Sequence, residues 1–506
     1  MNYGRLRSFA LVASLLATKA AYAQAPAEPS SNAPDASDAA PGGAAPVPES
    51  PPKPAPEARD AAPASASKPA TESAPPSAPE APAPSALPVT SRWHSSLYGF
   101  VELDAIHDST QSFSDGSNSG VVARRGTYAG DRGQALGTIK NSRLGLKLGA
   151  PDYYGVRSSA QLELDFFGIQ PTDATQNDFY VLGTMRVRQA FMKLETPIVD
   201  VLAGQYQDLF GWGGSGFYPN TVAFLGVPGE IYHRNPQLRL SKRIGGDVVS
   251  LEIAAAALRP VQRHSEVPDV QGGLKVSFDK WQGATSPGSQ QTQLTAAALG
   301  VSALGRRFVL PQFIGQPRNS TSQTGWGVAL DAVIPVIPAS SLEDHGNAFT
   351  LTAEASTGTG IADMYTNMTA GARLPELANP ANKMPPETYP QDVDPGLITF
   401  DADNRAKTYK WTGIVLGAQY YLPIAGGKIW VSGTYSQISS DNILLITPAA
   451  SWGAVYKSAR YYDVNVFAAL TPAAQLGLSF QATHQTYGDR STPTNLRSEL
   501  AMSFFF

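Results

Sequence analysis

The sequence predicts an all-β fold, a transmembrane antiparallel up-and-down β-barrel of about 16 strands. Two observations carry this prediction. From Trp93 to the end of the chain, short segments alternate apolar with polar or small residues, as a strand does when one face meets lipid and the other meets water. The connections between these segments largely alternate short and long, like the turns and loops at the two ends of a barrel. No stretch after Trp93 contains an apolar run long enough for a membrane helix.

The composition agrees with a barrel wall that faces lipid on one side and water on the other. Of the 506 residues, 42% are hydrophobic and only 16% are charged, and the chain has 46 glycines and no cysteine. Without cysteine there is no disulfide, no thiolate metal site and no lipid-anchored cysteine. No metal and no cofactor are expected for this protein.

The first 23 residues have the pattern of a secretory signal peptide. Arg5 and Arg7 precede the apolar run 9–17, and Ala21-Tyr22-Ala23 matches the small-x-small cleavage rule. Removing residues 1–23 removes three positive charges, so the formal net charge changes from −4 to −4 − 3 = −7. A chain this acidic is not expected to bind nucleic acid.

Residues 24–92 consist almost entirely of Ala, Pro, Ser, Glu and a few Lys. With few large apolar side chains to bury, this segment is expected to be disordered, and its prolines favour an extended polyproline II conformation. We interpret it as a linker in the periplasm. It is either a passive spacer, the interpretation we favour, or a contact with the cell wall.

The barrel domain is predicted over residues 93–506. In residues 156–166, for example, Leu162 and Leu164 share one face while Glu163 and Asp165 share the other. The predicted strands are 95–107, 141–150, 156–166, 184–195, 199–211, 236–244, 247–258, 269–279, 291–305, 324–334, 347–358, 408–422, 428–437, 460–470, 474–487 and 494–506. The longer connections are expected near 108–135, 168–183, 212–235, 306–323, 359–407 and 438–459.

The last strand carries the most specific local signal. Met502, Phe504 and the terminal Phe506 occupy one parity of an alternating apolar strand. A final strand that ends in Phe is typical of the signal read by the machinery that inserts barrels into the outer membrane. The protein is therefore expected in the outer membrane, surrounded by its lipid.

A barrel of about 16 strands is too wide for side chains to fill, so a water-filled lumen is expected. The loop 212–235 is unusually aromatic for a loop that faces water, and it is our candidate for a segment that folds inward and narrows the lumen. The alternative is an ordinary surface loop, and the segment 359–407 is the rival constriction or an external cap. The candidate side chains are Trp212, Phe217, Tyr218, Phe224, Tyr232 and Arg234.

The alternate side chains that are predicted to face the lumen include both basic and acidic groups. Antiparallel pairing would bring Arg186 and Arg188 close to Glu163 and Asp165 near the outer mouth. These groups could form a transverse field or simple salt bridges of the wall, and for any single residue the salt bridge is the favoured interpretation. As a group, the arginines suggest a path for small hydrophilic solutes that favours anions. The candidate lining residues are Arg143, Lys147, Arg157, Glu163, Asp165, Arg186, Arg188, Arg234, Arg239 and Arg243, with Glu252 and Asp279 as further acidic positions.

Several segments together resemble a known family. The segments 96–104 (SLYGFVELD), 141–147 (NSRLGLK), 163–168 (ELDFFG), 186–191 (RVRQAF) and 203–205 (AGQ) occur in an order similar to that of the DcaP-like porins. This resemblance covers residues 93–506 and implies a trimeric member of the general bacterial porin superfamily that passes small anions such as dicarboxylates. The family carries a coiled coil at its N-terminus, whereas this chain has no heptads there.

Two other functions remain open. An outer-membrane hydrolase would need a nucleophile beside a histidine, and the one histidine of interest, His484, has the parity of the outward face. A structural barrel that links the membrane to the cell wall is the second alternative. A plugged active transporter is not expected, because residues 24–92 cannot form a folded plug. We therefore expect a channel and not an enzyme.

Overall fold

A computed structural model describes residues 93–506 except 116–120, 169–183, 214–215, 220, 222–225, 263–264, 287–290, 312–319, 340, 367–395, 402 and 404. The signal peptide and the linker predicted for residues 1–92 lie outside the described residues. No described helix is long and apolar enough to cross a membrane.

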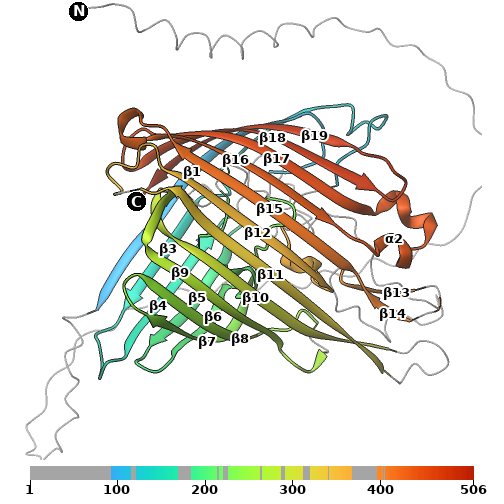
Figure 1. Ribbon diagram of the computed structural model, residues 1–506. Coiled ribbons are helices and arrows are strands. Elements are labelled where there is room, and N and C mark those ends of the chain that lie inside the picture. Colours follow the sequence, from blue (N-terminus) through green and yellow to red (C-terminus); the bar gives the residue numbers. More distant parts are fainter. Residues whose placement is uncertain are drawn as a thin grey trace, which may run out of the picture. The chain divides into compact units, whose positions relative to one another are not determined.

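Apart from a separate two-stranded hairpin, the described strands form one large antiparallel sheet that closes on itself (Figure 1). β1 pairs with the last strand, β19, with Glu102 opposite Ser503 and Asp108 opposite Arg497. β2 and β3 pair one after the other with β1, so they form a single interrupted wall strand. The wall therefore has 16 strands, as the alternation of the sequence predicts.

The strands of the wall have the following bounds. They are β1 (His94–Asp108), β2 (Gln134–Thr138), β3 (Arg143–Gly149), β4 (Arg157–Asp165), β5 (Arg186–Glu195), β6 (Asp200–Gln207), β7 (Arg234–Gly245), β8 (Val249–Leu258), β9 (Asp269–Thr285), β10 (Gln293–Pro311), β11 (Ser320–Ile337), β12 (Phe349–Thr359), β15 (Lys410–Tyr421), β16 (Ile429–Ser439), β17 (Tyr456–Ala469), β18 (Ala474–Tyr487) and β19 (Thr494–Phe505).

The long connections contain short elements of their own. A hairpin of β13 (Ile398–Phe400) and β14 (Ala406–Thr408) lies between β12 and β15. The helical turns are α2 (Ile443–Ile446) and the 3-10 turns Phe210–Trp212, Ala362–Met364, Ile424–Gly427 and Ala449–Ala454.

Side chains alternate across the wall as the sequence predicts. On β1, Val101 and Leu103 are more than half exposed, whereas Glu102 and Asp104, which alternate with them, are fully buried. The same alternation on β19 exposes Met502 and Phe504. The outer face of the described wall is therefore an apolar band suited to lipid, and polar groups point inward.

One predicted loop is wrong. The sequence suggested a long connection at 306–323, but β10 continues to Pro311 and β11 begins at Ser320. In the structure Arg306 points inward to buried carboxylates and Arg307 points outward, so the alternation continues through both arginines.

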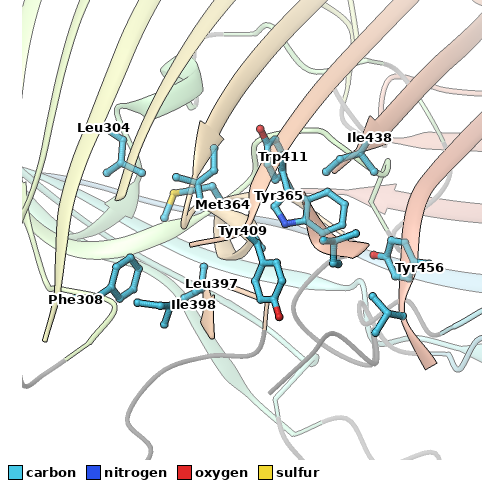
Figure 2. Close-up of a cluster of buried hydrophobic side chains, with 14 of the residues drawn as sticks. Leu304, Phe308, Met364, Tyr365, Leu397, Ile398, Tyr409, Trp411, Ile438 and Tyr456 are labelled. Atoms are coloured by element: carbon cyan, nitrogen blue, oxygen red, sulfur yellow. The ribbon is translucent and has the colours of Figure 1, made fainter. Parts of the chain in front are cut away.

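The outer end of the barrel has an apolar core inside the wall, where the long connections lie (Figure 2). Side chains of the wall, such as Phe308 of β10 and Trp411 of β15, pack there against Met364 and Tyr365 from the connection after β12. The described parts of the 359–407 segment therefore pack against the inner wall.

Candidate functional site: the interior of the barrel

Described residues of 208–233, between β6 and β7, lie against the inner surface of the barrel wall. The start of this segment is held by the side chain of Gln271 on β9, whose Oε1 accepts hydrogen bonds from the backbone N–H groups of Leu209 (2.7 Å) and Phe210 (2.9 Å). The N–H of Gly211 donates to Ser302 Oγ on β10 (2.9 Å). We call the described residues of 208–233 the inner segment.

Glycines on the wall make room for the inner segment. A Cβ atom at Gly273 or Gly300 would lie 2.9 or 2.7 Å from the indole of Trp212. At Gly327 it would lie 2.8 Å from the ring of Phe210. The indole Nε1–H of Trp212 donates to the carbonyl oxygen of Val301 (3.1 Å). Only positions without a side chain let these rings lie flat against the strands.

The end of the inner segment forms backbone hydrogen bonds with residues 361–366, before the chain enters β7. The backbone N–H of Tyr232 donates to the carbonyl oxygen of Met364 (3.0 Å), and the N–H of Thr366 donates to that of Glu230 (2.9 Å). The N–H of Ile231 donates to Glu354 Oε1 on β12 (2.8 Å). Segments from both candidate constrictions, 212–235 and 359–407, therefore meet inside the barrel.

The aromatic candidates of the inner segment have different surroundings. Trp212 and Phe217 are buried in an apolar cluster with residues of β8, β10 and β11. Tyr218 and Tyr232 contact each other, with ring centroids 5.1 Å apart. Phe224 lies outside the described residues.

The predicted charge cluster of β4 and β5 forms. Register places Asp165 opposite Arg186. Arg186 donates twice to Asp165 (3.0 and 2.7 Å), and Arg188 bridges Glu163 (2.8 Å) and Asp165 (2.9 Å). Arg143 on β3 lies 3.8 Å from Glu163. The carboxylates are thus neutralised in salt bridges of the wall.

The phenol of Tyr232 connects this cluster to the inner segment. It accepts a hydrogen bond from Arg188 Nη2 (2.8 Å) and a second one from Arg234. Burial opposes ionisation of the phenol, but the positive charges of Arg188, Arg234 and Arg143 outweigh it and lower the pKa of Tyr232 to about 7.

We call Arg143, Arg186, Arg188 and Arg234 the arginine cluster. Among the described residues, its four guanidinium groups face the two carboxylates of Glu163 and Asp165, which gives these groups a formal excess of 4 − 2 = +2 while the phenol of Tyr232 is neutral.

The other predicted lining residues are not part of this cluster. Arg157 pairs with Glu195 (3.3 Å), and Arg243 pairs with Asp279. The Lys147 ammonium lies over the Tyr98 ring at 4.7 Å. Arg239 donates to the carbonyl oxygen of Gln207 (2.6 Å), and its guanidinium lies over the ring of Tyr206. Glu252 pairs with Lys275 (2.9 Å).

Sequence reasoning missed an acidic strip on β1 and β19. Glu102, Asp104 and Glu499 point inward and are at most 1% exposed. Nearby, Arg497 donates to both carboxylate oxygens of Asp108 at 2.8 Å. The alternation rule would have found the acids, because Glu102 and Asp104 have the parity opposite to Val101 and Leu103.

A buried ion triad was also missed. Arg306 bridges Asp269 on β9 (2.9 Å) and Asp363 in the segment after β12 (2.5 Å), and all three side chains are at most 4% exposed. It was missed because residue 306 was assigned to a loop. The triad fixes residues 361–366 to the wall.

Metal binding and catalysis by histidine place separate requirements on the described part of the chain. No group of three or more His, Asp or Glu there could hold a metal ion. His484 faces outward and shares a hydrogen bond with the hydroxyl of Thr494 (2.7 Å), with no carboxylate among its described partners.

No family model matches the chain, and no curated protein matches its sequence. Among solved structures, the outer membrane channel DcaP of Acinetobacter baumannii matches with a TM-score of 0.56 and 18% identity, over 82% of this chain and 97% of that chain. The chain has the fold of a DcaP-like porin. Weaker matches of this DcaP-like barrel include the anion-selective porin from Comamonas acidovorans (TM-score 0.45, 9% identity, 82% of this chain and 100% of that chain). Another is OprB of Pseudomonas putida (0.39, 11%, 82% and 94%).

Proposed function

We propose that the protein is an outer-membrane porin, a water-filled channel through which small hydrophilic solutes diffuse. The closed wall of 16 strands, its apolar outer band and the DcaP-like fold support this function. The inner segment and residues 361–366 would narrow the lumen from the side of β9 to β16. The open path would then run along the wall of β3 to β5, where the arginine cluster lies.

We propose that the channel favours anions, and the arginine cluster is the observation that carries this proposal. It combines an excess of positive charge with access to solvent, since the side chains of Arg186 and Arg143 are 36% and 13% exposed. The acids of the strip on β1 and β19 are buried, so they present little charge to a passing ion.

Small dicarboxylates are the proposed solutes. A guanidinium binds a carboxylate through two parallel hydrogen bonds, and neighbouring guanidinium groups could bind both ends of one dicarboxylate. The resemblance to the DcaP-like porins supports the same solutes, and it also supports a homotrimer in the outer membrane. Residues 1–23 would be cleaved as a signal peptide, and residues 24–92 would extend into the periplasm as a spacer.

Recording from the purified protein in planar bilayers tests the proposal. In a salt gradient, the sign of the reversal potential should show anion preference, and Arg186→Gln with Arg234→Gln should reduce it. Arg157→Gln is the matched control. It removes one inward arginine from β4, about 26 Å along the strand from Asp165, and should change selectivity little. Dicarboxylates should block the current at lower concentration than monocarboxylates of equal size.

Two results would contradict the proposal. Absence of conductance would favour the structural tether, and hydrolysis of dispersed lipid or peptide that is lost in His484→Ala would favour the enzyme. Clear cation preference would reject the role of the arginine cluster while leaving the channel itself intact.

A further inference from the structure

The outer face of β16 to β19 carries a row of polar side chains within an otherwise apolar wall. Register places Gln437 opposite Arg460, Arg460 opposite His484 and His484 opposite Thr494. These four residues therefore lie at one level on four neighbouring strands, which lie side by side in Figure 1. All four point away from the lumen. We call them the polar row.

The polar row lies at the outer edge of the apolar band. It is at the end of the barrel from which the long connections leave, the outer end in barrels of this kind. From Phe504 to Thr494 the strand β19 extends about 33 Å, which is about 25 Å of height at a tilt of about 40°. An outer-membrane apolar band is about 25 Å tall. The row therefore meets the level of the lipid headgroups.

The residues above and below agree with this level. Directly below the row, Tyr435 contacts Tyr462 with ring centroids 5.3 Å apart, a pair typical of the aromatic girdle at a membrane interface. Directly above it, Ser439 and Thr486 flank Ser458. Below the tyrosines, the outward side chains are mainly apolar, as at Val464 and Phe480.

The row offers hydrogen-bond donors toward the lipid. Gln437 Oε1 already accepts from the hydroxyl of Tyr435 (3.0 Å), which leaves its amide N–H groups for a ligand. His484 Nδ1 is engaged with the Thr494 hydroxyl (2.7 Å), which leaves Nε2 facing outward. The ring of Tyr462 contacts His484 edge-on at 6.1 Å and limits its orientation.

Arg460 is the centre of the row. It is exposed, and within the described part of the chain no carboxylate lies within salt-bridge distance of its guanidinium. The outward positions of β16 to β19 include no Asp or Glu. At the level of the headgroups an outward arginine carries little penalty, and its charge is available to anionic groups of the lipid. The site thus offers donors and positive charge but no competing carboxylate.

We propose that Gln437, Arg460 and His484 bind a phosphate group of a phosphorylated glycolipid in the outer leaflet. A fully ionised phosphate group offers only hydrogen-bond acceptors, which match the donors of the row. A guanidinium group binds a phosphate through two parallel hydrogen bonds. The acyl chains of the lipid would lie on the apolar face below, along Val464 and Phe480. This site is on the outside of the wall and does not depend on conduction through the lumen.

Binding of lipid A to the full-length protein in detergent tests the proposal, measured by native mass spectrometry. Bisphosphorylated lipid A should bind at least about tenfold more tightly than its dephosphorylated form. Arg460→Gln should weaken the binding of bisphosphorylated lipid A by about tenfold or more, the effect of losing one charge-assisted contact. Excess inorganic phosphate should displace little lipid, because the acyl chains contribute to binding.

Arg307→Gln is the matched control. Arg307 is also an exposed, outward arginine, on β10, and its neighbour on β11 is Thr324, outside any comparable row. Its loss should leave binding unchanged. Retained heat-modifiable migration on gels will show that both variants fold.

Three outcomes would overturn the proposal. Equal binding of the phosphorylated and dephosphorylated lipids would exclude phosphate recognition. Unchanged binding in Arg460→Gln would exclude this row. Dissociation of the oligomer in Arg460→Gln with lipid binding intact would show instead that the row is a contact between subunits.

Discussion

Gly300→Val should release the inner segment from the wall. A Cβ at Gly300 would lie 2.7 Å from Trp212 Cδ1 and 3.1 Å from its Nε1, so the indole must move. Overpacking of this kind costs about 1–3 kcal/mol. Loss of the buried hydrogen bond from Trp212 to Val301 costs about 1–3 kcal/mol more.

Together these terms weaken docking of the inner segment by about 2–6 kcal/mol. Because 1.4 kcal/mol corresponds to a factor of ten, the docked population relative to the undocked one falls by between about one and four orders of magnitude. If the inner segment narrows the lumen, single-channel conductance in planar bilayers should rise or fluctuate between two levels. Trp212→Ala, which removes the same anchor without overpacking, should act in the same direction.

Gly305→Val is the matched control on the same strand. Gly305 faces outward, and a Cβ there would lie 3.4 Å from Val270 Cγ2, an ordinary contact. This variant should conduct like the unaltered protein. If Gly300→Val and Trp212→Ala both fold and also conduct like Gly305→Val, the inner segment does not constrict the channel and the reasoning is refuted.

Two further predictions concern charge. Arg306→Met should lower the free energy of unfolding by about 3–5 kcal/mol, because it leaves Asp269 and Asp363 buried without their partner. The temperature at which the barrel loses its heat-modifiable gel migration should therefore fall. An unchanged temperature would show that the triad adds no stability. Tyr232 should make selectivity depend on pH. Below its pKa of about 7 the phenol is neutral and the arginine cluster keeps its excess of +2, whereas above it the phenolate reduces the excess to +1. Anion preference should therefore decline from pH 6 to pH 8, and Tyr232→Phe should remove this decline; a decline that persists in Tyr232→Phe would assign it to another group.

Much of the wall could be predicted because apolar and polar side chains must alternate along a strand that faces lipid on one side and water on the other. Each strand must alternate, so Leu162 and Glu163 take opposite faces whatever the rest of the chain does. Cross-strand neighbours follow from the same rule together with the chain order, which is why the approach of the charged residues of β4 to those of β5 was predicted, without the individual pairs. The placement of a loop at 306–323 was wrong, because the alternation continues through Arg306 to the end of β10.

The course of the inner segment depends on residues far away in the chain. Trp212 lies against the wall because Gly273 and Gly300 on two other strands leave space for its ring. Those glycines have no local signature, since a strand tolerates glycine for several reasons. The aromatic content of 212–235 suggested an inward loop, but it could not indicate which strands would receive it.

The sequence by itself determined the barrel, an approximate number of 16 strands, the inner and outer faces of the strands, and the charges that come together on β4 and β5. These follow from side-chain parity and antiparallel order, which are local properties. Only the tertiary structure decided that the inner segment meets residues 361–366, that Tyr232 joins the arginine cluster, and that Arg460 is centred in a row on the outer face. Those contacts form between segments whose distance depends on closure of the whole sheet, and no periodicity encodes that distance.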